Sequence, residues 1–253
     1  VTASIFATGE VISNVLFTGL LAALFFLIGI HMDLDSLRKV SHYRKEVLVG
    51  GATIYLLAPL LAFIISLFVP ENLSNAFIAI GVSAAAIGSP VVFSNIGKGE
   101  GDLALIIGAL SLLTGFLIIP VLLIGFTVQF PITQFAVENL IFIGLPLLIG
   151  MVSQRYQNAL FDDFKHHFSK LALWLLVLIM AVQLQLIYQA QGLSFITELG
   201  LGLVLMTGFV LASFGISYII AKKTGIMERN ARTIGFVAGS KGIAIALFVA
   251  SQF

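Results

Sequence analysis

The sequence contains no cysteine and few charged residues. None of its 253 residues is Cys, and Asp, Glu, Lys and Arg together make up 10%. The lack of cysteine excludes disulfides, thiolate metal sites and cysteine nucleophiles. The scarcity of charge, with 59% hydrophobic residues and a mean hydropathy of +1.11, excludes a soluble globule, because too little polar surface is available. The composition instead predicts an all-α, polytopic membrane protein.

Eight apolar stretches are long enough to cross a bilayer as helices. A hydrocarbon core of about 30 Å needs roughly 20 apolar residues for each crossing. No polar linker between the stretches exceeds about fifteen residues, so we expect a single transmembrane transport domain over residues 1–253. The predicted helices cover residues 11–31, 45–69, 74–97, 103–127, 133–152, 168–190, 195–221 and 230–252.

Basic residues gather on one side of this predicted arrangement. The other side carries Glu10, Glu71, Glu138 and Glu198 and no basic residue. Because Lys and Arg are retained in the cytoplasm, we expect the basic loops there, with the start of the first helix and the end of the last one outside the plasma (inner) membrane. Twelve of the 13 basic residues lie in these loops, namely Arg38, Lys39, Arg44, Lys45, Lys98, Arg155, Lys165, Lys170, Lys222, Lys223, Arg229 and Arg232.

The remaining basic residue, Lys241, lies inside the last predicted helix. It follows Arg232 by nine residues, which places it roughly 14 Å deep at about 1.5 Å per residue. Ionisable residues at such depth usually face a cavity or a partner, yet no Asp or Glu lies in the middle of any predicted helix. Three interpretations follow. Burial keeps the amine neutral, backbone carbonyls from the break in 74–97 cap its charge, or the charged amine attracts an anionic substrate. A structural lysine that ties two broken helices together is the remaining interpretation.

Two polar breaks in the apolar stretches are near-copies of each other. Residues 86–90 are Ala-Ile-Gly-Ser-Pro, and residues 237–241, five stretches later, are Val-Ala-Gly-Ser-Lys. An odd number of crossings between the copies means that they run through the bilayer in opposite directions. Inverted repeats with interrupted helices at matching positions are typical of secondary transporters. The pattern predicts a five-plus-five inverted repeat with two broken, crossing helices and one further helix beyond each end of this sequence.

The two breaks supply most of the candidate binding residues. Pro90 removes a backbone donor, so carbonyls near Ala86 should be free and, with the Ser89 hydroxyl, suit a cation or a polar substrate group. A simple proline kink is the structural alternative. We expect no metal site and no enzyme, because the histidines lack ligand spacing and the helices contain neither a Ser/His pair nor an Asp dyad. The candidate substrate- or ion-binding residues are Gly88, Ser89, Pro90, Asn95, Ser111, Thr114, Gln183, Gly239, Ser240 and Lys241.

Several segments resemble the bile acid:sodium symporter family. Residues 217–247 are similar to its eighth-to-ninth helix region, and Phe25-Phe26-Leu-Ile-Gly29 is similar to its second helix. Residues 88–120 resemble its fourth and fifth helices, with a broken helix, a Gly-rich turn, Asp102-Leu-Ala-Leu and Ser111-Leu-Leu-Thr. The resemblance implies a panel domain and a core domain, with the broken helices crossing at the substrate and sodium sites.

This chain departs from the family's sodium-coupled members at several positions. Their fourth helix has Ser-Asn where this chain has Ser89-Pro90, and their ninth has an acidic residue where this chain has Gly235. Lys241 instead resembles the Gly-Ser-Lys of divergent relatives. The coupling ion, Na⁺ or H⁺, therefore stays open.

A second resemblance points to monovalent cation:proton antiporters. Residues 26–38 resemble an early helix of those proteins, and Ser240-Lys-Gly242 resembles a segment near their end. They need a mid-membrane Asp, which this sequence lacks, so the antiporter is the alternative. The sequence favours a secondary active transporter that moves a small organic anion by alternating access, with the lipid bilayer as its other partner, no nucleic acid and no cofactor other than Na⁺ as a coupling ion. A non-transporting receptor or scaffold is the remaining class, which measured solute flux would separate.

Overall fold

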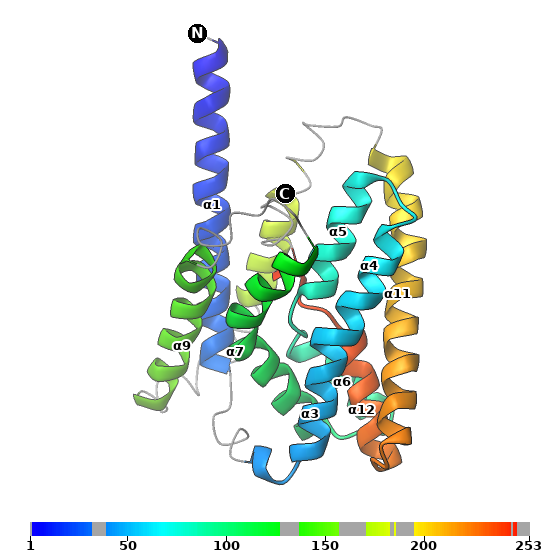
Figure 1. Cartoon of the computed structure of the whole chain (residues 1–253). Helices are drawn as coiled ribbons and strands as arrows, with labels where there is room; N and C mark the ends of the chain where they lie inside the picture. Colours follow the sequence, from blue (N-terminus) through cyan, green and yellow to red (C-terminus); the bar gives the residue numbers. More distant parts are fainter. Residues whose placement is uncertain are drawn as a thin grey trace. The chain divides into compact units, whose positions relative to one another are not determined.

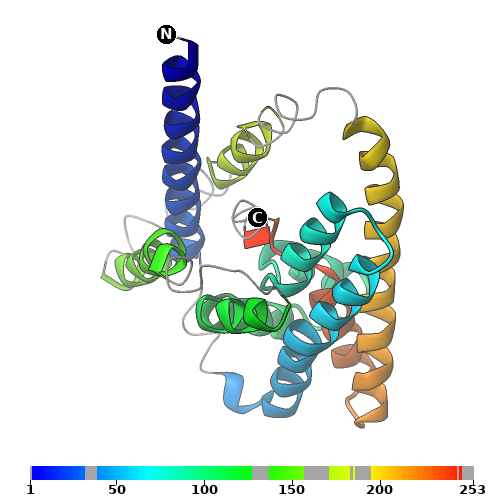
Figure 2. The same cartoon turned by 45° about the horizontal axis from the view of Figure 1, so that its top comes forward.

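The computed structural model describes residues 2–31, 39–126, 137–156, 171–182, 185, 195–243 and 245–246. The regular elements of this part of the chain are helices, so the all-α prediction is confirmed. Contacts divide the chain into two compact units (Figures 1 and 2). The first unit contains Val1–Met32 and Ala136–Ile196, and the second contains Asp33–Phe135 and Thr197–Phe253. The single transport domain stays a prediction.

The first unit contains two helices that approach each other at a pair of glycines. Its elements are α1 (Thr2–His31), the π-helical turn η3 (Leu140–Gly144) and α9 (Leu145–Tyr156), with further helix over residues 171–182. A Cβ on Gly29 would meet the backbone of Leu147 and Met151, and a Cβ on Gly150 would meet the backbone of Phe26. Small residues allow this approach in a membrane, where lipid is as apolar as the helices themselves.

The second unit contains the two broken helices. α4 packs against α5, and α12 packs against α3, α6 and α7. This arrangement places the end of α5, the start of α6 and the end of α12 in one region. The elements are η1 (Lys39–Ser41), α3 (Arg44–Ala52), η2 (Thr53–Leu57), α4 (Ala58–Ser66), α5 (Glu71–Val82), α6 (Gly88–Ile96), α7 (Gly101–Phe126), α11 (Phe195–Lys223) and α12 (Glu228–Gly239).

Prolines shape two helices of this unit. α3, η2 and α4 form one helix. Its π-helical turn ends at Leu57, and Ala58 and Pro59 follow directly. In that turn the Ala58 N–H donates to the Thr53 carbonyl, five residues back. α7 contains Pro120 and is bent by 68° at Phe116, four residues earlier. A proline inside a helix removes one backbone donor and crowds the preceding turn, which accounts for both irregularities.

The helix surfaces suit a bilayer. Two helices in the described part of the chain, Arg44–Ser66 and Gly200–Lys223, are long and apolar enough to cross a membrane, and the bent α7 makes a third if it counts as one span. Large apolar side chains are exposed along the second unit, including Leu60 on α4 and Val204 on α11, which is 71% exposed. Apolar exposure on this scale is rare on soluble proteins. The predicted multi-pass membrane protein is supported.

The helices agree with the predicted stretches, and two of the differences between them are large. Each stretch contains helix among its described residues. α1 begins at Thr2 rather than at residue 11, because polar residues such as Glu10 do not interrupt a helical backbone. The stretches 74–97 and 230–252 are interrupted after Val82 and Gly239, which confirms that both are broken.

Candidate functional site

The two broken helices meet through their extended segments. α5 ends at Val82 and α6 starts at Gly88, whereas α12 ends at Gly239 and helix resumes at residue 243. Between these ends Ala85 and Lys241 form an isolated antiparallel bridge. The Ala86 N–H donates to the Ser240 carbonyl at 2.9 Å, and the Gly242 N–H donates to the Ala84 carbonyl at 2.9 Å. The breaks therefore run in opposite directions, as the odd number of crossings predicted.

A serine ends the first half of each broken helix. Ser83 and Ser240 both have extended backbone, and each N–H donates to the carbonyls three and four residues back. The equivalent of Ser240 is thus Ser83, not Ser89 as the matched pentapeptides suggested. The pentapeptide match was offset because Gly88-Ser89 begins a half-helix, whereas Gly239-Ser240 ends one.

Lys241 extends from the second break into a group of backbone carbonyls. Its Nζ donates to the carbonyls of Gly81 at 2.9 Å, Ser83 at 2.9 Å and Ile54 at 3.2 Å. The residue is 8% exposed. Three acceptors match the three N–H donors of an ammonium group, whereas a neutral amine has two donors. This geometry suits a charged lysine capped by carbonyls, two of them at the end of α5.

Each of the three carbonyls lacks a donor in its own helix. The usual donor to the Ile54 carbonyl is the Ala58 N–H, but that group bonds Thr53, and the next residue, Pro59, has no N–H. Gly81 lies in the last turn of α5, where carbonyls have no helical partner, and Ser83 lies in the extended segment. The ammonium therefore satisfies three acceptors that proline and helix ends have freed.

The charge of Lys241 has no carboxylate to balance it in the crossing segments. Residues 47–70, 72–99 and 229–253 contain no Asp or Glu. Hydrogen bonds from neutral carbonyls stabilise the ammonium but leave its net charge in place. With the amine protonated, the site holds a positive charge, and these segments contain no acidic residue that offsets it.

Ser111 and Thr114, both predicted site residues, come from α7. The Ser111 hydroxyl accepts from the Ala85 N–H at 3.2 Å and donates to the Gly108 carbonyl at 2.8 Å, so it fixes the first break. Thr114 is exposed and donates to the Leu110 carbonyl in its own helix at 2.8 Å. The Tyr55 hydroxyl donates to the Ser111 carbonyl and lies 3.2 Å from the Thr114 hydroxyl.

The predicted residues after the first break lie at the start of α6. Gly88 and Ser89 are exposed there, and Pro90 is buried. Pro90 occupies the first turn, where a missing N–H removes no helical bond, so it starts the half-helix instead of kinking one. The freed carbonyls that the structure shows on Lys241 belong to other residues, Ile54, Gly81 and Ser83.

The other predicted residues have different positions. Asn95 is exposed in the last turn of α6, where it lies against Gly101. Gly239 is buried at the end of α12, where a Cβ would meet the Val210 carbonyl of α11 at 3.3 Å. Ser240 is half-buried in the second break. Gln183 lies outside the described residues.

Sequence reasoning missed the residues that shape the lysine's surroundings. Two signals were present in the sequence. Pro59 inside the stretch 45–69 indicates a carbonyl without a helical donor, and Ser83 is a polar residue inside the stretch 74–97. Gly81 gave only a general signal for close packing. Its Cβ position is filled by Ala62 of α4.

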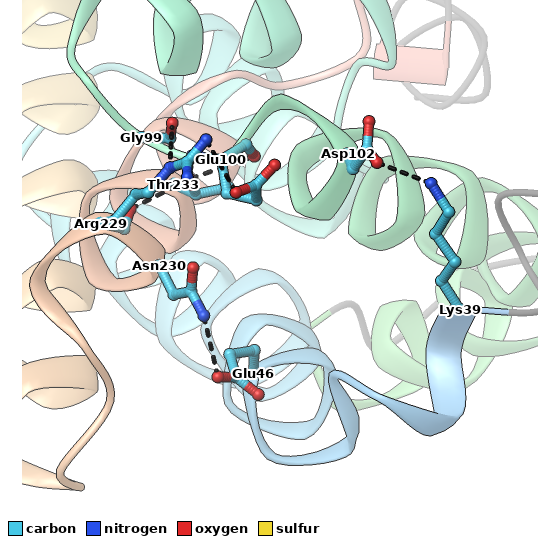
Figure 3. A network of polar contacts seen from close by, with 8 residues as sticks. All are labelled: Lys39, Glu46, Gly99, Glu100, Asp102, Arg229, Asn230 and Thr233. Carbon is cyan, nitrogen blue, oxygen red and sulfur yellow. Dashed lines mark hydrogen bonds and ion pairs between the residues drawn. The ribbon is translucent and has the colours of Figure 1, made fainter.

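Polar contacts tie the start of α12 to the neighbouring elements (Figure 3). Arg229 lies 2.9 Å from the Glu100 carboxylate and donates to the Gly99 carbonyl at 3.1 Å. The Glu100 N–H donates to the Thr233 hydroxyl at 2.7 Å, and the Asn230 amide donates to Glu46 of α3 at 3.0 Å. These contacts fix α12 to the turn between α6 and α7 and to α3.

Further ion pairs lie at the same end of the second unit, and one of them is between Arg232 and Glu228 at 3.3 Å. Lys39 pairs with Asp102 at the start of α7 at 2.7 Å, and Lys222 pairs with Glu228 at 2.7 Å. The Lys222 ammonium and, to a smaller extent, the Tyr218 hydroxyl donate to Glu228. These hydrogen bonds lower the pKa of the Glu228 carboxyl to about 2. The loops before α3, between α6 and α7, and between α11 and α12 thus lie at one end of the second unit. The side of the membrane that they face stays a prediction.

Comparison with known families finds a match over most of the chain. The model of the Sodium Bile acid symporter family matches residues 18–192, more than half of the 253 residues and including the first break. No curated protein matches the chain. The match favours the symporter resemblance over the antiporter one. The chain belongs to the sodium bile acid symporter family.

Proposed function

We propose that this chain is a secondary active transporter that moves a small organic anion across the plasma (inner) membrane by alternating access at the crossing of α5 and α6 with α12. Its family consists of transporters rather than enzymes. Broken helices that cross and carry polar groups are the usual site of substrate binding in such carriers.

The observation that supports an anion is the unbalanced charge of Lys241. The residue is buried, and the segments that cross there contain no Asp or Glu. A site with net positive charge and low dielectric walls attracts anions and repels cations. The same observation gives no support to the antiporter alternative, which needs an acidic residue to exchange a cation for a proton.

The start of α6 supplies the groups that would contact the anion. The Lys241 ammonium uses its three N–H donors on carbonyls, so its charge acts on the substrate without a direct hydrogen bond. Gly88 and Ser89 are exposed at the first turn of α6, where backbone N–H groups have no helical acceptor. Such half-helix N-termini bind anionic substrate groups.

Alternating access requires that the substrate reach this crossing from each side in turn. We propose that the end of the second unit with Lys39, Lys222 and Arg229 faces the cytoplasm, because basic residues are retained there. The substrate would then leave past these polar contacts.

Transport is tested with the full chain in proteoliposomes. Labelled carboxylate and sulfonate anions, a neutral solute and an organic cation are offered under Na⁺, H⁺ and voltage gradients. We expect uptake of at least one anion, lowered about tenfold or more by Lys241→Met and unchanged by Lys223→Met at an exposed position. Absence of anion uptake under every gradient, or uptake of the cation alone, would refute the proposed function.

A further inference from the structure

The carbonyls around Lys241 form the kind of site that normally holds a monovalent cation. They belong to Ile54, Gly81 and Ser83, and they converge on one point. Main-chain carbonyls freed at helix breaks coordinate Na⁺ in secondary transporters, because each supplies a partial negative charge without a proton. The sodium bile acid symporter family implies Na⁺ as the cation for such a site.

The point is already filled by the chain itself. The Lys241 Nζ lies 2.9 Å, 2.9 Å and 3.2 Å from the three oxygens, with one carbonyl for each N–H donor. A second cation at this position would displace the amine or meet its charge at close range in a medium of low dielectric. Na⁺ therefore does not fit these carbonyls while the lysine is in place.

We propose that the Lys241 ammonium is a tethered cation that permanently occupies the carbonyl site at the crossing, so that this site needs no Na⁺. The proposal rests on the proposed function in one respect: in a transporter, the tethered ammonium takes the place of one coupling ion. Its test does not depend on transport, because a bound cation also stabilises the fold.

The proposal distinguishes a filled cation site from a merely structural lysine. In a merely structural role, loss of the amine leaves three unsatisfied carbonyls, and no ion compensates. In a cation site, Lys241→Ala removes the whole side chain and leaves space beside the carbonyls for a free ion. Lys241→Met removes the same charge but fills that space with an apolar chain of similar length.

The experiment measures the melting temperature of the purified full chain in NaCl, KCl and choline chloride at equal ionic strength. We expect the wild type to melt at the same temperature in all three salts. We expect Lys241→Ala to melt lower in choline and to regain roughly 3–5 °C in NaCl or KCl when the cation is at about ten times its dissociation constant. We expect Lys241→Met to melt lower without any recovery.

Other outcomes overturn the proposal. Stabilisation of the wild type by Na⁺ equal to that of Lys241→Ala would mean that the carbonyls bind the ion beside the lysine. A Lys241→Ala protein that no cation stabilises, or that cannot be recovered folded in any of the salts, would mean that the carbonyls do not form a cation site. Lys223→Ala, at an exposed lysine, controls for effects of lost charge elsewhere.

The two proposals fail independently. A wild type that moves no anion, together with the expected cation response of Lys241→Ala, refutes the transport proposal and leaves the tethered cation standing. If the wild type takes up an anion, and cations stabilise it as much as they stabilise Lys241→Ala, the tethered cation is refuted and the transport proposal stands.

Discussion

Pro59 and Lys241 together explain how a charge is held inside an apolar helix bundle. The chain separates Lys241 from Ile54 by 187 positions, yet the amine takes the carbonyl that Pro59 leaves without a donor. A proline whose missing N–H would be a defect elsewhere becomes useful here, because the freed oxygen stabilises an ammonium. Because of Pro59, the Ile54 carbonyl needs another donor, and the Lys241 ammonium needs an acceptor.

Gly81 is the residue at which a single methyl group should disturb the site. Its Cβ would fall on Ala62 of α4 and within 3.3 Å of the Pro59 Cα, so Gly81→Ala must separate α4 from α5. We expect it to lower the free energy of unfolding by about 1–3 kcal/mol. Chemical denaturation of the detergent-solubilised protein, followed by circular dichroism, measures the change.

Gly88→Ala is the matched control, because nothing lies within 4 Å of its Cβ position. We expect its unfolding to match the wild type within about 0.5 kcal/mol. Equal effects of the two substitutions would contradict the close approach of α4 and α5 at Gly81.

α12 is held at both of its ends. At its C-terminal end the extended segment pairs with the first break, and at its N-terminal end Arg229 and Asn230 contact other elements of the second unit. The helix is short, from Glu228 to Gly239, so a displacement at one end must move the other. A movement of the polar N-terminal end of α12 should therefore also move Lys241.

The link between α12 and the turn before α7 predicts a measurable coupling. Arg229 and Glu100 lie 2.9 Å apart, with side chains 63% and 20% exposed. A double-mutant cycle with Arg229→Ala, Glu100→Ala and the double variant should give a coupling of about 0.2–1 kcal/mol in the free energy of unfolding, as expected of a partly exposed ion pair.

Asp102 supplies the control for this cycle. It pairs with Lys39 rather than with Arg229. The effects of Arg229→Ala and Asp102→Ala should therefore add within about 0.3–0.5 kcal/mol. A coupling with Asp102 as large as that with Glu100 would show that the measurement reports general electrostatics instead of the specific pair.

The whole molecule is asymmetric in charge, and this asymmetry predicts its orientation. Lys45 at the start of α3 and Lys223 at the end of α11 are exposed, and Glu71 is exposed at the start of α5. Labelling of Lys45→Cys, Lys223→Cys and Glu71→Cys in intact cells with an impermeant thiol reagent measures sidedness. We expect only Glu71→Cys to react from outside, and the other two to react after the membrane is opened.

The unmodified chain is a clean background for this experiment, because it contains no cysteine. Reaction of Lys45→Cys and Lys223→Cys from outside would invert the proposed orientation. Reaction of those two from opposite sides would contradict the structure itself, which places the ends of α3 and α11 near each other through Lys45 and Gly225.

Much of this molecule could be predicted from local sequence. Apolar length predicted where the helices lie, and Gly-Ser in two stretches predicted that both are broken. The spacing of the breaks predicted their opposite directions, because crossings simply alternate. These are properties of short windows and of counting, so they need no knowledge of which helices are neighbours.

What surrounds Lys241 was decided only by the tertiary structure. The depth of the lysine and the lack of nearby acids could be counted along the chain, but its three acceptors come from Ile54, Gly81 and Ser83. The carbonyl of Ile54 is distant in sequence, and the backbone looks the same at every residue, so no pattern of side chains marks which oxygen is free. The helix ends and the π-helical turn set that choice, and they depend on how α4, α5 and α12 pack. The sequence by itself determined that a charge must be accommodated in the membrane, and the packing determined which atoms accommodate it.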